Sequence, residues 1–320
     1  YDKLLLATGS SAISPPIPGL DLPQVHSCWT LEDARHIIEL AQPGANVVLI
    51  GAGFIGCIIL EALMKRGIKL SVIETGNRMV PRMLNEKAGG LLEKWCIDKG
   101  IDVRTSCSVE SVEAADNNGV QVSLSDGSKL PAALVITATG VKPNVDMLEG
   151  TDIKLDVGIL VNHSMQTSNS DIYAAGDVAQ GIDFSTGNFE VQAIQPTASD
   201  HGRIAALNMS GKIIEHHGTL NMNILDTVGL ISCSFGLWMG VDDGEQAELY
   251  NPGEFQYINL QFDGECLVGA STIGKTQHIG VLRGLIESRI QLGPWKGRLL
   301  KDPTRIMEAY VGSTQVLGYA

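Results

Sequence analysis

The residues of this sequence best placed for chemistry are three glycines, Gly51, Gly53 and Gly56, which form the pattern Gly-x-Gly-x-x-Gly. In such a turn the first glycine permits a sharp bend, the second lets the backbone approach a pyrophosphate, and the third lets a helix pack closely on a strand. The N-terminus of the following helix supplies N–H donors and the positive end of its dipole. With Phe54 and Ile55 between the second and third positions, these glycines predict a dinucleotide-binding site.

A carboxylate follows at the spacing that such a site requires. Glu74 lies 23 residues after Gly51, where it can accept a hydrogen bond from a ribose 2′-hydroxyl. A carboxylate repels a 2′-phosphate, so NAD is favoured over NADP. Arg78 and Arg82 come soon afterwards, and an arginine can accommodate that phosphate, so NADP stays open. The alternative interpretation is a glycine turn in an ordinary α/β protein with Glu74 on the surface.

The elements that must position these residues form a βαβ unit. Val47–Ile50 is predicted as a buried strand, Cys57–Arg66 as a helix and Leu70–Ile73 as a second parallel strand. The connection between the two strands should be right-handed. A further helix over Lys87–Lys99 and a buried strand over Leu134–Thr137 extend the same α/β pattern.

The flanking regions supply a different set of elements. A short strand over Leu4–Ala7 leads into Thr8-Gly9, and a strand over Asp171–Ala175 delivers Asp177 at its carboxyl end. Beyond them we expect one helix at 193–208, strands at 221–226, 256–262 and 265–270, and a final helix at 279–291. This alternating, glycine-punctuated texture predicts an α+β domain at the C-terminal end.

Composition excludes several classes of function. The 320 residues carry 23 basic and 36 acidic side chains, a net charge of −13, which disfavours non-specific binding to nucleic acid. The six cysteines contain no C-x-x-C pair, so no metal site or disulfide framework is predicted, and a reducing cytoplasm is the simplest compartment. The most apolar run, Val47–Leu60, is too short for a membrane span.

In their order along the chain, these motifs resemble those of a known family. The segments are Ala7-Thr8-Gly9, the glycine turn with Glu74, Ala138-Thr139-Gly140 with Pro143-Asn144, and Ala175-Gly176-Asp177. They are similar to the pyridine nucleotide-disulfide oxidoreductases, flavoproteins with two dinucleotide-binding domains. The absence of a His-plus-Glu motif in the tail favours the branch of nitrite reductase flavin domains, rubredoxin and ferredoxin reductases, and NADH oxidases.

The resemblance implies an α/β architecture in which a Rossmann-like NAD domain is inserted in a partial FAD-binding domain. An α+β interface or dimerisation domain follows. The predicted boundaries are 1–34 and 150–212 for the FAD-binding segments, 35–149 for the NAD domain and 213–320 for the interface domain. The implied cofactors are FAD and NAD(P)H, with NAD favoured.

The resemblance also assigns site residues. The predicted NAD contacts are Gly51, Gly53, Phe54, Ile55, Gly56, Glu74, Arg82, Thr139 and Gly140, and the predicted FAD contacts are Thr8, Gly9, Gly176, Asp177 and Gln195. Asp177 is expected to bind the ribityl chain, with a helix N-cap as the alternative. Gln192 and His201 are expected near the flavin ring, or else are ordinary helix positions. No metal ligand and no catalytic side chain is assigned.

Two departures from the family pattern keep a second function open. The glycine-rich unit that holds the adenosine diphosphate of FAD is expected before Tyr1, so the sequence is interpreted as a fragment. Ile58 stands where many relatives have a glutamate, and the neighbouring acid is Glu61. The first hypothesis is a flavoprotein reductase that passes hydride from NADH to FAD and electrons to an acceptor. The second is a nucleotide-binding module without catalysis of its own.

The partner of such a reductase is left open by the sequence. The acceptor is expected to be a protein, a domain or a small molecule, and a homodimer is possible. Four basic residues near the C-terminus form either a docking patch or a solvated helix end: Lys296, Arg298, Lys301 and Arg305. A third hypothesis, an NAD dehydrogenase acting directly on a small substrate, leaves both Ala-Thr-Gly segments unexplained.

Overall fold

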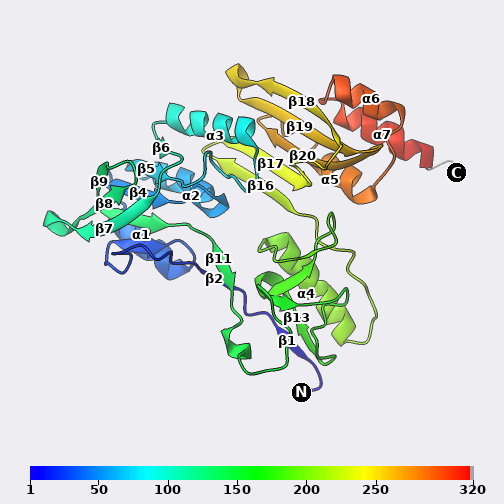
Figure 1. Cartoon of the computed structure of the whole chain (residues 1–320), viewed down its shortest axis with the longest axis horizontal. Coiled ribbons are helices and arrows are strands. Elements are labelled where there is room, and N and C mark those ends of the chain that lie inside the picture. The colour runs from blue at the N-terminus through cyan, green and yellow to red at the C-terminus, as the bar shows by residue number, and fades with distance from the viewer. Residues whose placement is uncertain (318–320) are drawn as a thin grey trace. The chain divides into compact units, whose positions relative to one another are not determined.

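The computed structural model describes residues 1–317, so the last three residues of the predicted interface domain lie outside the described part. The chain divides into two compact units. Unit 1 comprises Tyr1–Ser11 and Val141–Asn221, and unit 2 comprises Ala12–Gly140 together with the chain from Met222 onward. Figure 1 shows their elements. The α/β class and the mixture of parallel and antiparallel sheets agree with the predicted fold class.

Unit 2 is built on a five-stranded parallel sheet. Its strands, in spatial order, are β3 (Val25–Ser27), β10 (Leu134–Thr137), β4 (Asn46–Ile50), β5 (Lys69–Ile73) and β6 (Asp102–Arg104). The last four residues of β4 and all four of β10 are buried. Because a parallel sheet is covered on both faces, its strands are continuous apolar runs, which is why the sequence predicted them.

Three helices accompany this sheet: α1 (Leu31–Leu40), α2 (Phe54–Met64) and α3 (Glu86–Asp98). Helix α1 begins with a capping box between Thr30 and Asp33. Helix α2 starts three residues before its predicted position, because Gly53 is its N-cap. It is apolar around most of its surface, as expected for a helix packed on two sides: it contacts β5 and also the C-terminal sheet at β16.

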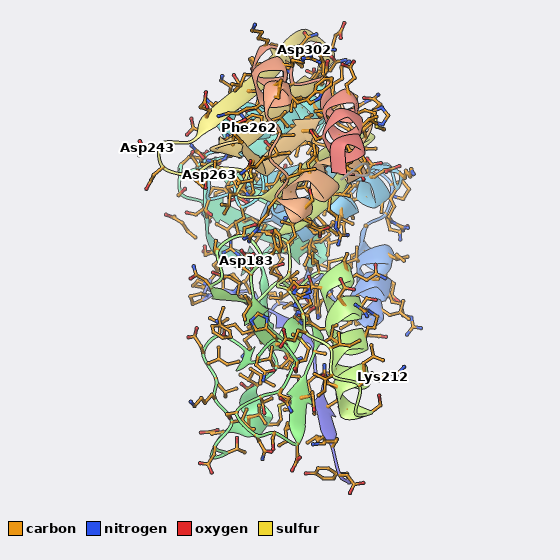
Figure 2. All side chains as sticks on the ribbon, turned by 90° about the vertical axis from the view of Figure 1, so that its right-hand side faces the viewer. Asp183, Lys212, Asp243, Phe262, Asp263 and Asp302 are labelled. Atoms are coloured by element: carbon orange, nitrogen blue, oxygen red, sulfur yellow. The ribbon has the colours of Figure 1, made fainter. Side chains whose placement is uncertain are left out.

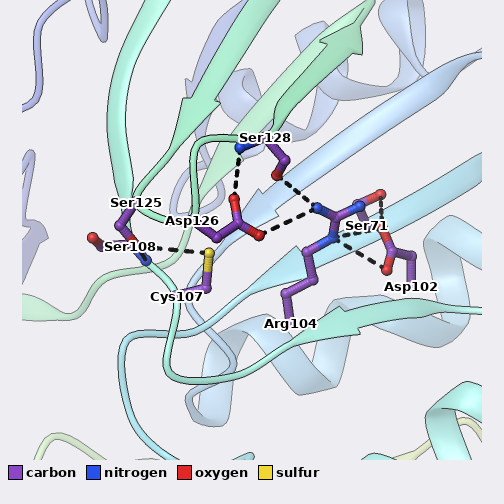
Figure 3. A network of polar contacts seen from close by, with 8 residues as sticks. All are labelled: Ser71, Asp102, Arg104, Cys107, Ser108, Ser125, Asp126 and Ser128. Carbon is purple, nitrogen blue, oxygen red and sulfur yellow. Dashed lines mark hydrogen bonds and ion pairs between the residues drawn. The ribbon is translucent and has the colours of Figure 1, made fainter.

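A small antiparallel sheet packs apolar side chains against the parallel sheet. It consists of β7 (Val109–Ala114), β8 (Val120–Leu124) and β9 (Lys129–Ala132). Val112 and Val122 share a core with Val48 and Ile73. Polar contacts link the two sheets (Figure 3). Arg104 of β6 donates to the Ser128 hydroxyl at 2.9 Å and also to the carboxylate of Asp102. The same carboxylate accepts a hydrogen bond from Ser71. These contacts fix the carboxyl end of β6 beside Glu74.

The C-terminal part of unit 2 is an antiparallel sheet with helices. In spatial order its strands are β16 (Met222–Thr227), β17 (Leu230–Gly236), β20 (Cys266–Ile273), β19 (Gln256–Asp263) and β18 (Glu245–Asn251). Helix α5 (Ile279–Ser288) packs on β17 and β20, α6 (Pro294–Lys301) packs on β18, and α7 (Ile306–Leu317) contacts α5 and α6. Phe262 and Asp263, at the end of β19, are labelled in Figure 2.

The prediction of one final helix over 279–291 is wrong. Helix α5 ends at Ser288 because Arg289 adopts a left-handed conformation with φ of 49°, and two more helices follow. The sequence analysis also missed β17 and β18. Strand β17 is buried at six of its seven positions and so lacks the alternation used to find half-buried strands, whereas β18 is a largely exposed edge strand.

Unit 1 contains shorter elements. Strand β1 (Leu4–Leu6) pairs in parallel with β13 (Ile172–Ala174), and helix α4 (Gln195–Met209) packs on β13. The remaining strands are β2 (Ser10–Ala12) with β11 (Val141–Pro143), and β12 (Ile159–Leu160) with β14 (Ala179–Ile182) and β15 (Phe189–Glu190). Short 3₁₀ turns occur at Asp146–Leu148 and Gly176–Val178 in unit 1, and at Asp116–Asn118 and Pro252–Glu254 in unit 2.

None of the helices in residues 1–317 combines the length and the apolar character that crossing a membrane requires.

Candidate dinucleotide-binding site

The glycine turn of unit 2 is tightly packed at its first and third glycines. Gly51 has φ of 102°, and a Cβ there would lie 2.5 Å from the carbonyl oxygen of Ala138. A Cβ on Gly56 would overlap the carbonyl oxygen of Gly51. Protein packing alone therefore requires glycine at both positions, as the sequence predicted from the turn and from the contact between helix and strand.

The second glycine has a different environment. Gly53 has φ of −77°, which any residue can adopt, and a Cβ there would have no protein atom within 4 Å. No side chain caps the N-terminus of α2, so the N–H groups at Phe54 and Ile55 lack a side-chain acceptor. Because packing gives no reason for glycine here, the open space beside these donors fits the approach of a dinucleotide pyrophosphate.

Glu74 lies at the carboxyl end of β5, beside the turn, and only 8% of it is exposed. Its Oε2 accepts a hydrogen bond from the N–H of Ala52 at 2.8 Å, and its Oε1 accepts from the N–H of Gly76 at 2.7 Å and from the Thr75 hydroxyl. The carboxylate therefore braces the glycine turn, a role that the spacing did not reveal. Since a carboxylate offers about four acceptor sites, it can still take a ribose hydroxyl.

Two arginines follow Glu74, and the first of them, Arg78, binds backbone carbonyl groups. Arg78 donates to the carbonyl oxygens of Leu84 at 2.7 Å and Pro81 at 3.3 Å. Arg82 is exposed and has no hydrogen-bond or ion-pair partner among residues 1–317. It is the one of the pair that remains available to a phosphate.

The two Ala-Thr-Gly segments share one local arrangement. In unit 2, Thr139 donates its hydroxyl to the carbonyl oxygen of Ile13 at 2.9 Å, and Gly140 has φ of 114°. In unit 1, Thr8 donates to the carbonyl oxygen of Asn144 at 3.0 Å, and the Asn144 amide returns a bond to Thr8. Both hydroxyls thus hold a neighbouring segment of backbone, which gives these predicted cofactor residues a structural role as well.

The other predicted FAD residues lie in unit 1. Gly176 has φ of 77°, and Asp177, half-buried after it, accepts from the Ser10 hydroxyl at 2.7 Å. Gln195 is exposed at the first position of α4, and no side chain caps that helix. Gly9 also has a positive φ, and a Cβ there would meet nothing within 4 Å. Two glycines with positive φ, a carboxylate and an uncapped helix end suit a polar ligand such as the ribityl chain or ring edge of a flavin.

Two other residues predicted near the flavin ring are engaged within the protein. Gln192 donates to Asp183, which is labelled in Figure 2, at 2.7 Å. His201 is 2% exposed, its Nε2 lies 3.3 Å from the Thr219 hydroxyl, and its Nδ1 has no partner in the described structure. Burial and, to a smaller extent, the neighbouring His216 lower the pKa of His201 to about 4. A neutral, buried imidazole does not serve as a general acid near neutral pH.

Four of the six cysteines are buried: Cys57, Cys96, Cys107 and Cys233. All six are free. Burial raises the pKa of Cys57 well above its ordinary value, and that of Cys96 to about 12, so neither forms the reactive thiolate. Both pack in the core as small apolar side chains, whereas Cys28 and Cys266 are half-exposed.

Sequence reasoning missed two residues that shape the turn. Val80 adopts a left-handed conformation with φ of 44°, and its N–H donates to the carbonyl oxygen of Ala52 at 2.9 Å. The Asn85 side chain caps α3 and reaches Tyr257 of the C-terminal sheet. A β-branched residue is unfavourable in a left-handed conformation, so the sequence gives no signal that the backbone bends in this way at Val80.

Comparison with known proteins shows the family to which the chain belongs. Residues 1–200 match the family model described as pyridine nucleotide-disulphide oxidoreductase. The NADH-dependent phenylglyoxylate dehydrogenase subunit epsilon of Aromatoleum evansii is 31% identical over 98% of this chain and 75% of its own length. An NADH oxidase of Methanocaldococcus jannaschii is 34% identical over 69% of this chain and 50% of its own length. An NAD-dependent persulfide reductase structure from A. fulgidus has a TM-score of 0.83 at 28% identity, over 92% of this chain and 58% of its own.

This chain thus spans three quarters of one curated relative and half of the other. The family predicted from the motifs is confirmed, and members of this family are NAD(P)H-dependent flavoprotein oxidoreductases that use FAD. The match covers both Ala-Thr-Gly segments, the glycine turn and the Gly-Asp pair. The chain belongs to the pyridine nucleotide-disulphide oxidoreductase family.

Proposed function

We propose that this chain binds NADH at the glycine turn of unit 2 and acts as part of an NADH-dependent FAD oxidoreductase. The observation that carries the proposal is Gly53, a glycine that neither backbone conformation nor packing requires, beside the uncapped start of α2. When both cofactors are bound, hydride passes from the dihydronicotinamide to the flavin, which then delivers two electrons to an acceptor. The chain itself supplies position and electrostatics.

The residues proposed to hold NADH are those of the turn and its surroundings. The N–H groups at Phe54 and Ile55 would bind the pyrophosphate, and Glu74 would accept from the ribose. On the flavin side, Asp177 would accept from the ribityl chain, and the start of α4 at Gln195 would face an electron-rich edge of the ring. Ile58, 48% exposed on α2, offers no polar group to either cofactor.

NADH is the proposed donor rather than NADPH. The buried Glu74 carboxylate would meet the 2′-phosphate of NADPH, whereas Arg82 is exposed and is the sole partner proposed for that phosphate. We therefore expect NADH to bind at least about tenfold more tightly than NADPH in calorimetric titrations, since losing a hydrogen bond to a charged group costs about 1.5–3 kcal/mol. Equal affinities would overturn the assignment of Glu74.

The matching variant is Glu74→Gln, which should weaken NADH binding and bring the two affinities within about a factor of three of each other. Its control is Glu61→Gln, because Glu61 lies on α2 in an exposed pair with Lys65. The control should leave both affinities unchanged. Thermal unfolding of each variant separates a loss of binding from a loss of fold, since Gln at position 74 also places an amide donor beside a backbone N–H.

The electron acceptor is proposed to be a separate protein or domain, or a small molecule, and a homodimer through the C-terminal domain is the proposed assembly. Of the four basic residues considered for docking, Lys296 pairs with Glu245 and Arg305 with Glu308, so two of the four charges are already neutralised by carboxylates. This favours the solvated helix end. Six free cysteines support the cytoplasm as the compartment.

The alternative is a nucleotide-binding module without catalysis of its own. Ile58 favours it, since an aliphatic side chain takes no polar part beside the nicotinamide. The two functions predict different results when NADH binds: an oxidoreductase reduces its bound flavin, whereas a binding module does not.

A further inference from the structure

The segment Thr75–Leu84, which joins β5 to α3, holds the glycine turn from outside. Within this connecting segment the N–H of Val80 donates to the carbonyl oxygen of Ala52 at 2.9 Å. The N–H of Ala52 donates to Glu74, so both backbone groups between the first two glycines are taken. The position of the turn therefore depends on the connecting segment as well as on Glu74.

The conformation of Val80 is strained. A β-branched residue with φ of 44° costs about 1–3 kcal/mol and persists only where its surroundings fix it. Val80 is buried, its carbonyl oxygen accepts from the N–H groups of Met83 and Leu84, and Arg78 donates to Leu84. These contacts define the segment locally, but they do not attach its far end to the rest of the unit.

The far end is attached to the C-terminal sheet through Tyr257. Asn85, the first residue after the segment, caps α3 through its Oδ1 and donates its Nδ2 to the Tyr257 hydroxyl at 2.7 Å. Tyr257, on β19, is fully buried and donates in turn to Glu248 at 2.9 Å. Glu248 also forms an ion pair with Lys87 in the first turn of α3. The start of α3 is thus joined to the sheet by three linked polar contacts.

The hydroxyl of Tyr257 is the central member of this chain of contacts. Burial raises the pKa of Tyr257, so the hydroxyl stays protonated and donates to Glu248 while it accepts from Asn85. The ring already shares the apolar core with Met79, Val80 and Leu84, and a phenylalanine would fill the same space. Removing the hydroxyl therefore breaks the bond to Asn85 while it leaves the apolar packing and the ion pair between Lys87 and Glu248 in place.

We propose that Tyr257 is a positioning residue for the NADH site: through Asn85 it fixes the connecting segment, and through Val80 it fixes the glycine turn. The inference rests on the proposed function. It assigns to the C-terminal domain a part in dinucleotide binding, although Tyr257 lies 172 residues from Asn85 along the chain.

The test is calorimetric NADH titration of the full chain carrying Tyr257→Phe, together with amide hydrogen exchange at Val80 without nucleotide. We expect the dissociation constant for NADH to rise three- to tenfold and exchange at Val80 to accelerate. Asn85→Ser retains a residue that caps helices but is too short to reach Tyr257, so it should reproduce both effects. The double variant should be no weaker than either single one.

The control is Trp95→Phe, which weakens the same interface at the other end of α3. Trp95 donates its Nε1 to the carbonyl oxygen of Val228 at 3.2 Å and packs edge-on against Phe255. It should lower the unfolding midpoint by a few degrees, as Tyr257→Phe does, without changing NADH affinity. Unchanged affinity in Tyr257→Phe, or an equal loss in Trp95→Phe, overturns the inference alone. A wild-type chain that does not bind NADH overturns the proposed function and this inference with it.

Discussion

Replacing Gly53 with alanine should remove tight NADH binding while leaving the stability of the protein unchanged. The added methyl meets no protein atom within 4 Å and suits the backbone conformation, so the fold has no reason to respond. It occupies the space through which a pyrophosphate would approach the start of α2. Losing one or two hydrogen bonds to a charged group, at about 1.5–3 kcal/mol each, raises the dissociation constant roughly ten- to a hundredfold or more.

Two further glycine variants make this result interpretable. Gly90→Ala, in α3, also places a methyl in open space, and it should stabilise the helix by about 0.5–1 kcal/mol without affecting NADH. Gly56→Ala should lose both binding and stability, because its methyl overlaps the Gly51 carbonyl oxygen. Calorimetry and thermal unfolding measure the two quantities. If Gly53→Ala binds NADH as tightly as the wild type does, the dinucleotide does not lie at this turn.

Acid should destabilise unit 1 through His201. In the folded protein the pKa of His201 is lowered to about 4, against an ordinary value of 6.5, because the ring is buried and lies beside His216. The native imidazole stays neutral while the unfolded chain takes up a proton below pH 6.5. Stability is therefore fully present above about pH 6.5 and falls as the pH drops toward 4, by about 3 kcal/mol in total.

Urea unfolding at a series of pH values between 4 and 7 measures this loss. His201→Gln should flatten the pH dependence, leaving the smaller contribution of His216, whose pKa is also lowered by burial. His36→Gln is the matched control, because it makes the same substitution at a histidine that is 44% exposed on α1. A wild-type protein whose unfolding free energy is constant over this range would show that His201 is not held neutral.

Much of the site was predictable because it is local in sequence. The bend at Gly51, the close contact at Gly56 and the carboxylate after β5 all follow from one βαβ unit, whose spacing is set by strand and helix geometry. The two buried parallel strands on either side of the turn were equally clear as apolar runs. Helix α2 was placed three residues late, because a glycine N-cap gives no side-chain signal at the start of a helix.

The rest depends on contacts that no local pattern encodes. The Asn85–Tyr257 bond joins residues 172 positions apart, and Val80 is held in a conformation that its own propensity opposes. The bonds of Glu74 to Ala52 and Gly76 likewise arise from the fold of the turn, and they add a structural role to the predicted contact with a ribose. Strand β17 also could not be found from a local pattern. It is buried at six of its seven positions, so its sequence lacks the alternation of apolar and polar residues that marks a half-buried strand.

NADH bound by this chain is proposed to deliver hydride to FAD. The most direct test is an anaerobic titration of the purified protein, supplied with FAD, with NADH while the absorbance of oxidised flavin is recorded. We expect about one NADH per bound flavin to bleach that absorbance, since hydride transfer carries two electrons. NADH that binds without bleaching the flavin would contradict the claim and identify the chain as a nucleotide-binding module.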